Sequence, residues 1–111
     1  MKPEQMLEVA RRVYPADLWQ LRSGVVVNFT AKYPDPLIFN PKLTGTDREK
    51  AQALDVILAV KRLYPRSVWS FDWQEYDGQK AVIYEIGHRD EERGRGNDIL
   101  TAAMLALLES K

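Results

Sequence analysis

Apolar residues recur at helical spacing in three stretches of the chain. Prolines follow the first two stretches within two residues, and a proline denies the residue before it the helical conformation. The third stretch is apolar on every side, which is typical of a helix that is deeply buried or covered by a partner. The pattern therefore predicts three helices, over residues 3–13, 47–63 and 99–110.

Two of these predicted helices also carry start signals. Thr46 and Glu49 have the spacing of a capping box, in which each side chain bonds the other residue's backbone N–H. Asn97 or Asp98 is the expected N-cap of the last helix.

Alternating apolar and polar residues after the first helix predict a β-hairpin over residues 18–31. A three-residue loop at 22–24 places its glycine at the left-handed bulge position and sets Trp19 opposite Val27. A two-residue loop would instead set Trp19 opposite Asn28. Because Val27 matches the apolar face better, we expect the three-residue loop.

A second hairpin is predicted over residues 68–86, where Asp77-Gly78 is a strong two-residue turn signal. That turn fixes the register and gathers the aromatic residues on one apolar face. The expected pairs on this face are Trp73 with Val82, Phe71 with Tyr84, and Trp69 with Ile86.

Residues 11–21 and 61–71 share Arg, Tyr, Pro and Trp at equal spacing. One explanation is that two helix-to-strand corners need the same parts, a proline to stop the helix and a tryptophan to anchor the strand. The other is a duplicated unit. A pseudo-repeat would then cover residues 4–31 and 47–87, closed by a helix over 97–110.

Together these elements predict one domain over residues 1–111 of α/β (α+β) sandwich class. The expected order is α-β-β-α-β-β-α, with a mostly antiparallel sheet of about four strands packed by three helices. The connector between the halves contains a candidate edge strand at 37–39, which its neighbouring prolines would keep short. Residues 88–96 are expected to form a charged loop.

Composition narrows the function classes. Sixteen basic residues balance sixteen acidic ones, so the net charge of zero gives no long-range attraction to nucleic acid or anionic membrane. The chain has no cysteine, which excludes disulfides and a thiol nucleophile. Its longest apolar run, residues 99–108, is about half of a membrane span. A cytoplasmic protein is expected.

Three candidate chemical sites are weak. One is a metal site, one is a phosphate site at the backbone of residues 94–98, and one is a pair of acid–base carboxylates on the polar sheet face. None has the residue spacing of a specific motif, and no catalytic residue, cofactor or metal is predicted. The residues considered are His88, Asp90 and Glu91 for the metal and Asp72, Glu75 and Glu85 for the carboxylates.

The aromatic residues raise the question of nucleic-acid binding, because single strands stack on exposed aromatic side chains near cations. The predicted register turns Trp69 and Trp73 inward; if part of the sheet were uncovered, they would form a platform with Arg66. The candidate nucleic-acid contacts are Arg66, Lys80, Arg89, Arg93 and Arg95.

The order of parts from the Phe39–Pro41 segment to the last helix resembles small phage and prophage proteins of the ABA-sandwich type. The shared features are a capped helix, a hairpin with a tryptophan-bearing strand, and an alanine- and leucine-rich final helix, over about residues 39–109. The resemblance implies a compact α/β sandwich of phage-like origin, and it implies no catalytic residues.

We therefore expect a non-enzymatic, phage- or prophage-like protein that acts through protein–protein contacts. An immunity or inhibitor protein, or a nucleic-acid-binding module using a basic patch, is the alternative. The excess apolar surface of the last helix further predicts a homodimer contact. Its candidate interface residues are Ile99, Met104, Leu105 and Leu108.

Overall fold

The computed structural model of this chain describes residues 1–28, 37–86 and 91–109. The chain divides into two compact units, Met1–Asp55 (unit 1) and Val56–Lys111 (unit 2). The described residues form three helices and two three-stranded antiparallel sheets, so the α+β class is confirmed. The single four-stranded sheet and the α-β-β-α-β-β-α order are wrong, because each predicted hairpin gains a third strand.

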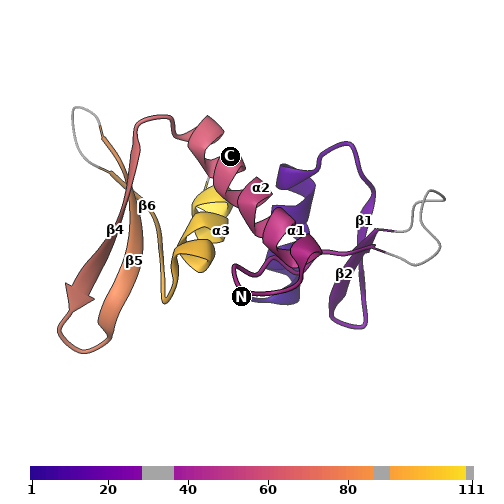
Figure 1. The fold of residues 1–111 in the computed structure, drawn as a ribbon, viewed down its shortest axis with the longest axis horizontal. Coiled ribbons are helices and arrows are strands. Elements are labelled where there is room, and N and C mark those ends of the chain that lie inside the picture. The colour runs from indigo at the N-terminus through magenta and orange to yellow at the C-terminus, as the bar shows by residue number, and fades with distance from the viewer. Residues whose placement is uncertain (29–36, 87–90, 110–111) are drawn as a thin grey trace. The chain divides into compact units, whose positions relative to one another are not determined.

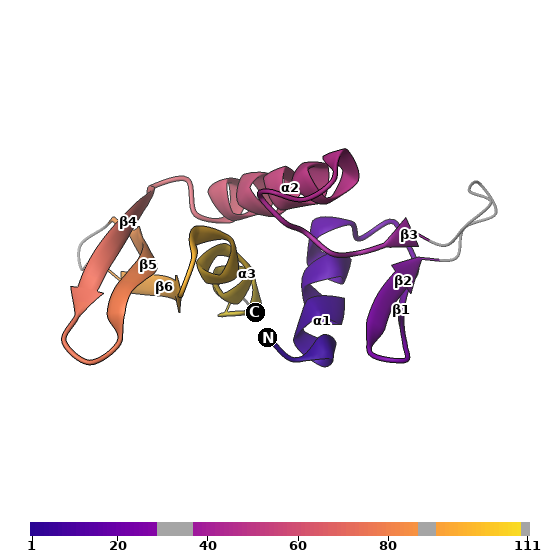
Figure 2. The same ribbon diagram turned by 60° about the horizontal axis from the view of Figure 1, so that its bottom comes forward.

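Unit 1 contains a helix and a small sheet in the order β1-β2-β3 (Figure 2). Its third strand is the short edge strand expected in the connector, and it pairs antiparallel with β2. The elements are α1 (Pro3–Val13), β1 (Trp19–Arg22), β2 (Val25–Asn28) and β3 (Leu37–Ile38).

The core of unit 1 forms where α1 meets β1 and β2. Val9 and Ala10 are fully buried on the helix, and Trp19 and Phe39 are almost fully buried beside them. The rings of Trp19 and Phe39 lie 5.7 Å apart in an edge-to-face arrangement. Trp19 therefore anchors the strand that follows the stopped helix, as predicted.

The register predicted for the first hairpin is wrong. Trp19 lies opposite Asn28, and only Ser23 and Gly24 connect the strands. Both residues have positive φ, 51° and 77°, as a type I′ turn requires. This turn matches the twist of the strands, and that gain outweighs the cost of placing a serine in the left-handed region.

The capping box at the start of α2 (Asp47–Leu63) is confirmed. Glu49 N–H donates to Thr46 Oγ1 (3.2 Å), and Thr46 N–H donates to Glu49 Oε1 (2.8 Å). Asn40 Nδ2 donates to the other Glu49 oxygen, and Lys42 Nζ lies 3.9 Å from it. The backbone hydrogen bond from Thr46 is the main cause that lowers the pKa of Glu49.

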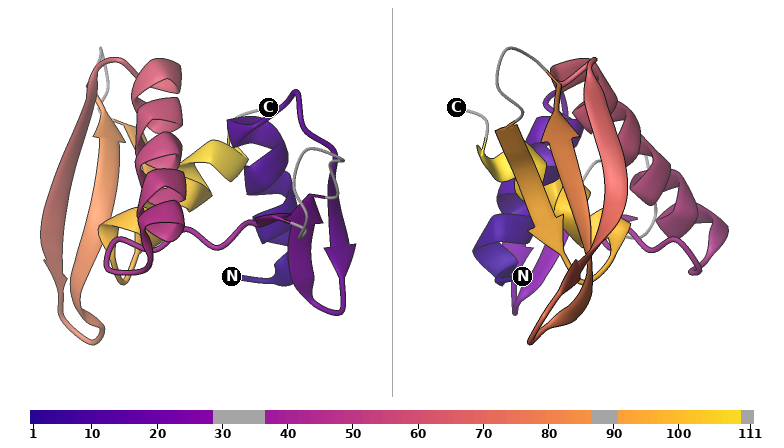
Figure 3. Two further views of the ribbon diagram at one scale, coloured as in Figure 1. Left: turned by 45° about the vertical axis from the view of Figure 1, so that its right-hand side comes forward. Right: turned by 90° about the vertical axis from the view of Figure 1, so that its left-hand side faces the viewer.

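Unit 2 contains the end of α2, a sheet in the order β4-β5-β6, and α3 (Figure 1). Its three strands lie side by side, as the right-hand view of Figure 3 shows. The elements are β4 (Ser67–Gln74), β5 (Gly78–Glu85), β6 (Glu91–Gly96) and α3 (Ile99–Glu109).

The register predicted for the second hairpin is also wrong. Trp73 pairs with Gln79, Phe71 with Ala81, and Trp69 with Ile83. The chain turns through residues 75–77, and Gly78, with φ +73°, is the first residue of β5. The glycine keeps its left-handed role, but a longer turn moves the partner strand by three residues.

The charged loop predicted at 88–96 is wrong over residues 91–96, which form β6 and pair with β5. Ile83 faces Gly94 and Ala81 faces Gly96 in this pairing. Residues 88–90 lie outside the described residues, as do 29–31 of the proposed repeat and residue 110 of the last helix.

Two glycines of β6 let α3 approach the sheet very closely. A Cβ atom at Gly94 would lie 2.1 Å from the Ala102 carbonyl oxygen, and one at Gly96 would lie 3.0 Å from Ala102 N. Ala102, Ala103 and Ala106 of α3 are fully buried. Most apolar side chains of α3 are thus buried inside unit 2. No helix among the described residues has the length and apolarity that crossing a membrane requires.

The close packing predicts that Gly94→Ala destabilises unit 2 by about 2–3 kcal/mol, because backbone atoms of α3 cannot move away as a flexible side chain can. The free energy of unfolding in urea is the measurement. Gly78→Ala is the control: its Cβ would meet open space, and only the positive φ costs about 1 kcal/mol. Equal losses in the two variants would contradict the packing argument.

Candidate functional site

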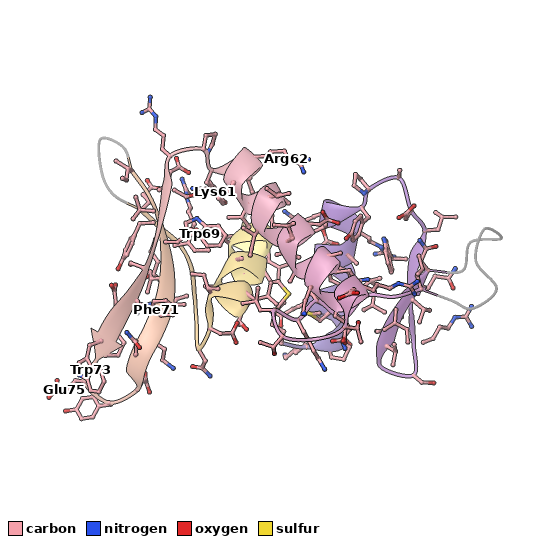
Figure 4. All side chains as sticks on the ribbon, in the orientation of Figure 1. Lys61, Arg62, Trp69, Phe71, Trp73 and Glu75 are labelled. Carbon is pink, nitrogen blue, oxygen red and sulfur yellow. The ribbon has the colours of Figure 1, made fainter. Side chains whose placement is uncertain are left out.

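Three aromatic side chains lie on one face of β4, and we call Trp69, Phe71 and Trp73 the aromatic stripe. Alternate residues of a strand share a face, and the stripe follows this period (Figure 4). Phe71 is 59% exposed and Trp73 is 77% exposed, while Trp69 is half-buried. Large aromatic side chains with this exposure are unusual on a surface without a partner.

The stripe shares its sheet face with α3, but α3 packs on β6 and β5. Ala81 and Ile83, the β5 partners of Phe71 and Trp69, are fully buried. The face is therefore covered over two strands, while the aromatic side chains of β4 extend past the covered area. The condition for an exposed aromatic platform, that part of the sheet be uncovered, is met at β4.

β4 is also an edge strand. Ile86 N–H donates to the Arg66 carbonyl (3.2 Å), and the register from Ser67 to Gln74 continues without a shift. In an antiparallel pair, backbone groups point toward the partner strand at every second residue and away from it at the others. The N–H and C=O groups of the stripe residues therefore point outward, away from β5.

The two edges of this sheet differ in their protection. Natural edge strands are kept from pairing by charges, prolines, bulges or shortness. β6 has four charged residues among six and a register shift against β5. β4 is eight residues long, has no proline and no register shift, and has Asp72 as its one charged residue. The β4 edge thus lacks a proline, a register shift and shortness, and its charges are limited to Asp72 and to Lys61 of α2, whose Nζ donates to the Ser67 carbonyl (3.3 Å).

The single charge of β4 is held against the sheet. The Tyr84 hydroxyl on β5 donates a hydrogen bond to Asp72 Oδ2, and this hydrogen bond raises the pKa of Tyr84. Ser70 Oγ lies 3.4 Å from the other Asp72 oxygen. The Asp72 carboxylate therefore lies on the polar face of the sheet, where it does not block another strand from pairing with the outer edge of β4.

The stripe runs between a basic end and an acidic end. Lys61 of α2 lies near its start, with Nζ 5.9 Å from the Trp69 ring centre, whereas Arg62 points away from the three rings (Figure 4). Arg66 directly precedes β4, and Glu75 directly follows it. Figure 4 shows Lys61 and Glu75 at opposite ends of the three aromatic side chains.

The predicted nucleic-acid contacts are mostly engaged with carboxylates or amides. Arg93 lies 3.2 Å from Glu85 and 3.0 Å from Glu91, and Arg95 lies 2.5 Å from Glu92. Lys80 Nζ donates to Asn97 Oδ1 (2.6 Å). Arg66 lies beside the stripe, and Arg89 is outside the described residues.

The predicted interface on α3 is largely internal. Met104 is buried, and Ile99, Leu105 and Leu108 are half-buried. A homodimer contact through α3 stays a prediction, with less free apolar surface than the sequence suggested.

The other candidate sites have structural roles. Asp98 Oδ1 accepts from Thr101 N–H (2.8 Å) and so occupies the helix start that a phosphate would need. Ser70 pairs with Val82 and not with Glu85. Within 1–28, 37–86 and 91–109 no three His, Asp or Glu side chains are grouped as a metal site would require. His88 and Asp90 lie outside those ranges.

Unit 1 has a pocket of about 250 Å³ that the sequence did not suggest, lined by residues including Tyr14, Trp19 and Gln52. Tyr14 donates to Asp55 Oδ2 (2.5 Å), and burial together with this bond raises the pKa of Tyr14. Gln52 accepts from Asn40 N–H and donates to the Ile38 carbonyl, both at 2.8 Å. These polar groups hold the connector to α2, so the pocket is weaker as a site than β4.

No protein-family model matches the chain, and neither a curated protein nor a solved structure matches it.

We expect Trp73→Ala to change the free energy of unfolding by less than about 0.5 kcal/mol, because the Trp73 side chain is largely exposed and packs little against the core. Trp69→Ala should cost about 2 kcal/mol, since Trp69 is half-buried and its Nε1 donates to Ser67 Oγ (2.9 Å). Urea unfolding measures both. A large loss in Trp73→Ala would mean that Trp73 has a structural role and is not free for binding.

The Tyr84–Asp72 hydrogen bond predicts a pH dependence. A tyrosine whose pKa is raised by folding adds stability that is complete below its ordinary value of 10.0 and is lost as the pH rises through the folded value. Tyr84→Phe should therefore be less stable than wild type at pH 8, and the difference should shrink above about pH 10.

Tyr76→Phe is the control for this titration, because the Tyr76 side chain is 93% exposed in the turn. Urea unfolding at pH 8 and at pH 10.5 would compare the variants. A Tyr84→Phe difference that stays constant with pH would contradict the assignment.

Proposed function

We propose that this chain is a non-enzymatic protein-binding module whose binding element is the outer edge of β4. The observation that carries the proposal is a long edge strand, without proline or register shift, that also displays exposed aromatic side chains. An extended segment of a partner protein would add to the sheet as a further strand. Strand addition of this kind is a recurring mode of peptide recognition.

Affinity in this mode comes from the backbone. The outward N–H and C=O groups of Trp69, Phe71 and Trp73 would pair with the main chain of the added segment. Since these groups take no part in the β4–β5 ladder, binding requires no rearrangement of the sheet. A preformed edge lowers the ordering cost of association.

Specificity would come from the side chains. Apolar or aromatic residues at every second position of the segment would pack on the aromatic stripe. An acidic residue near Lys61 and a basic residue near Glu75 would complete the match. An immunity or inhibitor protein that covers a target's surface is one form of such a module, and the phage-like origin expected from the sequence is compatible with it.

Nucleic-acid binding has one favourable observation, the exposed stripe beside cations. The acidic end at Glu75 and the ion pairs of Arg93 and Arg95 oppose it, because phosphates need cations that are not already neutralised. We therefore favour a protein partner and treat nucleic acid as an outcome of the test.

The test is selection from a phage-displayed library of random decapeptides against the full chain. We expect bound peptides to lose at least about tenfold in affinity for Phe71→Pro and for Trp73→Lys. Proline at 71 removes an outward N–H and leaves the β4–β5 hydrogen bonds in place, so the variant should still fold. Circular dichroism would confirm this.

Gln79→Lys is the matched control, because Gln79 is exposed on β5 opposite Trp73 and the variant adds the same charge off the edge. A library without binders, or binders indifferent to both edge variants, would contradict the proposal. Salt-dependent binding of a fluorescent oligothymidine that is lost in Trp73→Ala would replace it with nucleic-acid binding.

A further inference from the structure

We infer that the β4 edge accepts a second copy of this chain, through antiparallel pairing of the two β4 strands about a two-fold axis at Phe71. The inference rests on the proposed function, since it names one occupant of the same edge. The result would be a six-stranded sheet built from the two copies of β4-β5-β6. An isologous contact of this type needs a surface that complements itself.

The sequence of β4 has this self-complementarity. From Phe71, one residue in either direction is small or acidic, and two residues in either direction is tryptophan. Antiparallel pairing with Phe71 opposite the second copy's Phe71 sets Trp69 opposite the second copy's Trp73. The most exposed tryptophan of each copy is then covered by the half-buried tryptophan of the other.

The backbone permits the same register. Residues with outward N–H and C=O groups must face one another for each pair to exchange two hydrogen bonds. The backbone N–H and C=O groups of Trp69, Phe71 and Trp73 all point outward. The proposed register pairs each of these residues with one of the same three residues in the second copy. Three such pairs supply about six main-chain hydrogen bonds.

Charge selects the antiparallel orientation. Each β4 runs from a basic end, with Lys61 and Arg66, to an acidic end, with Glu75 and Asp77. In the antiparallel pair, the basic end of one copy meets the acidic end of the other at both ends of the seam. In a parallel pair, like charges would meet at both ends, which disfavours binding.

Asp72 excludes a neighbouring register. In the proposed register Asp72 lies opposite the second copy's Ser70, whose hydroxyl is a suitable neighbour for a carboxylate. Shifting one strand by two residues toward the turn would place Asp72 opposite the second copy's Asp72, at the close spacing of a non-hydrogen-bonded pair. Directly opposed like charges destabilise strand pairing.

The experiment is sedimentation equilibrium of the full chain from roughly 1 to 500 µM, a range that covers micromolar affinity. Wild type should form a dimer. Arg66→Glu and Glu75→Lys should each weaken self-association about tenfold, because both ends of the seam become like-charged. An equimolar mixture of the two variants should recover the wild-type affinity, since opposite charges meet again at both ends.

The outcomes separate this inference from the proposed function. A wild-type monomer over the whole range overturns the self-pairing, while peptide capture at β4 would still stand on its own test. Self-pairing is also overturned if both variants dimerise with the wild-type affinity, or if their mixture does not recover that affinity. The dimer contact would then lie elsewhere, such as on α3. Both variants change exposed side chains, and the β4–β5 ladder uses only the backbone carbonyl of Arg66, so both should fold as wild type does.

Discussion

The arrangement of unit 2 depends on how closely α3 approaches β6. At Gly94 there is room for a hydrogen but not for a methyl group, because the carbonyl oxygen of Ala102 lies only 2.1 Å from the position that a Cβ would take. This closeness requires small residues on both sides, glycines on the strand and alanines on the helix. It also fixes which part of the sheet the helix covers.

The exposure of the aromatic stripe follows from that constraint. A helix held on β6 and β5 buries Ala81 and Ile83 but leaves the large side chains of β4 at the margin. The β6 edge has four charged residues, two glycines and a register shift, whereas the β4 edge has one charged residue, no glycine and no register shift. A long edge strand with one charged residue among eight and with exposed aromatic side chains is a hazard for aggregation unless a specific occupant covers it.

The helices were predictable because their signals are local. Prolines, the capping box and the apolar periodicity placed the helices at residues where the structure begins and ends them, within the described ranges. The edge strand of the connector was also anticipated. Each of these features depends on residues that are close together in the sequence, so the local sequence pattern is enough to predict it.

The sheet registers and β6 could not be predicted, because they depend on contacts between distant residues. Each of the two turns differs from its prediction by one residue in length, and a shift of register changes which residues face each other. β6 has almost no apolar pattern, since glycines replace side chains where α3 packs. The candidate site was missed for the same reason: the aromatic face was expected to be covered along its whole width.

Glu49 links the beginning of α2 to the connector that precedes it. Its carboxylate accepts hydrogen bonds from Thr46 and Asn40, and its pKa is lowered from the ordinary 4.5. The stability it adds is present above that ordinary value and is lost as the pH falls through the lowered one. Protonation of Glu49 therefore weakens its hydrogen bonds with both Thr46 and Asn40, so the start of α2 and the connector lose stability over the same pH range.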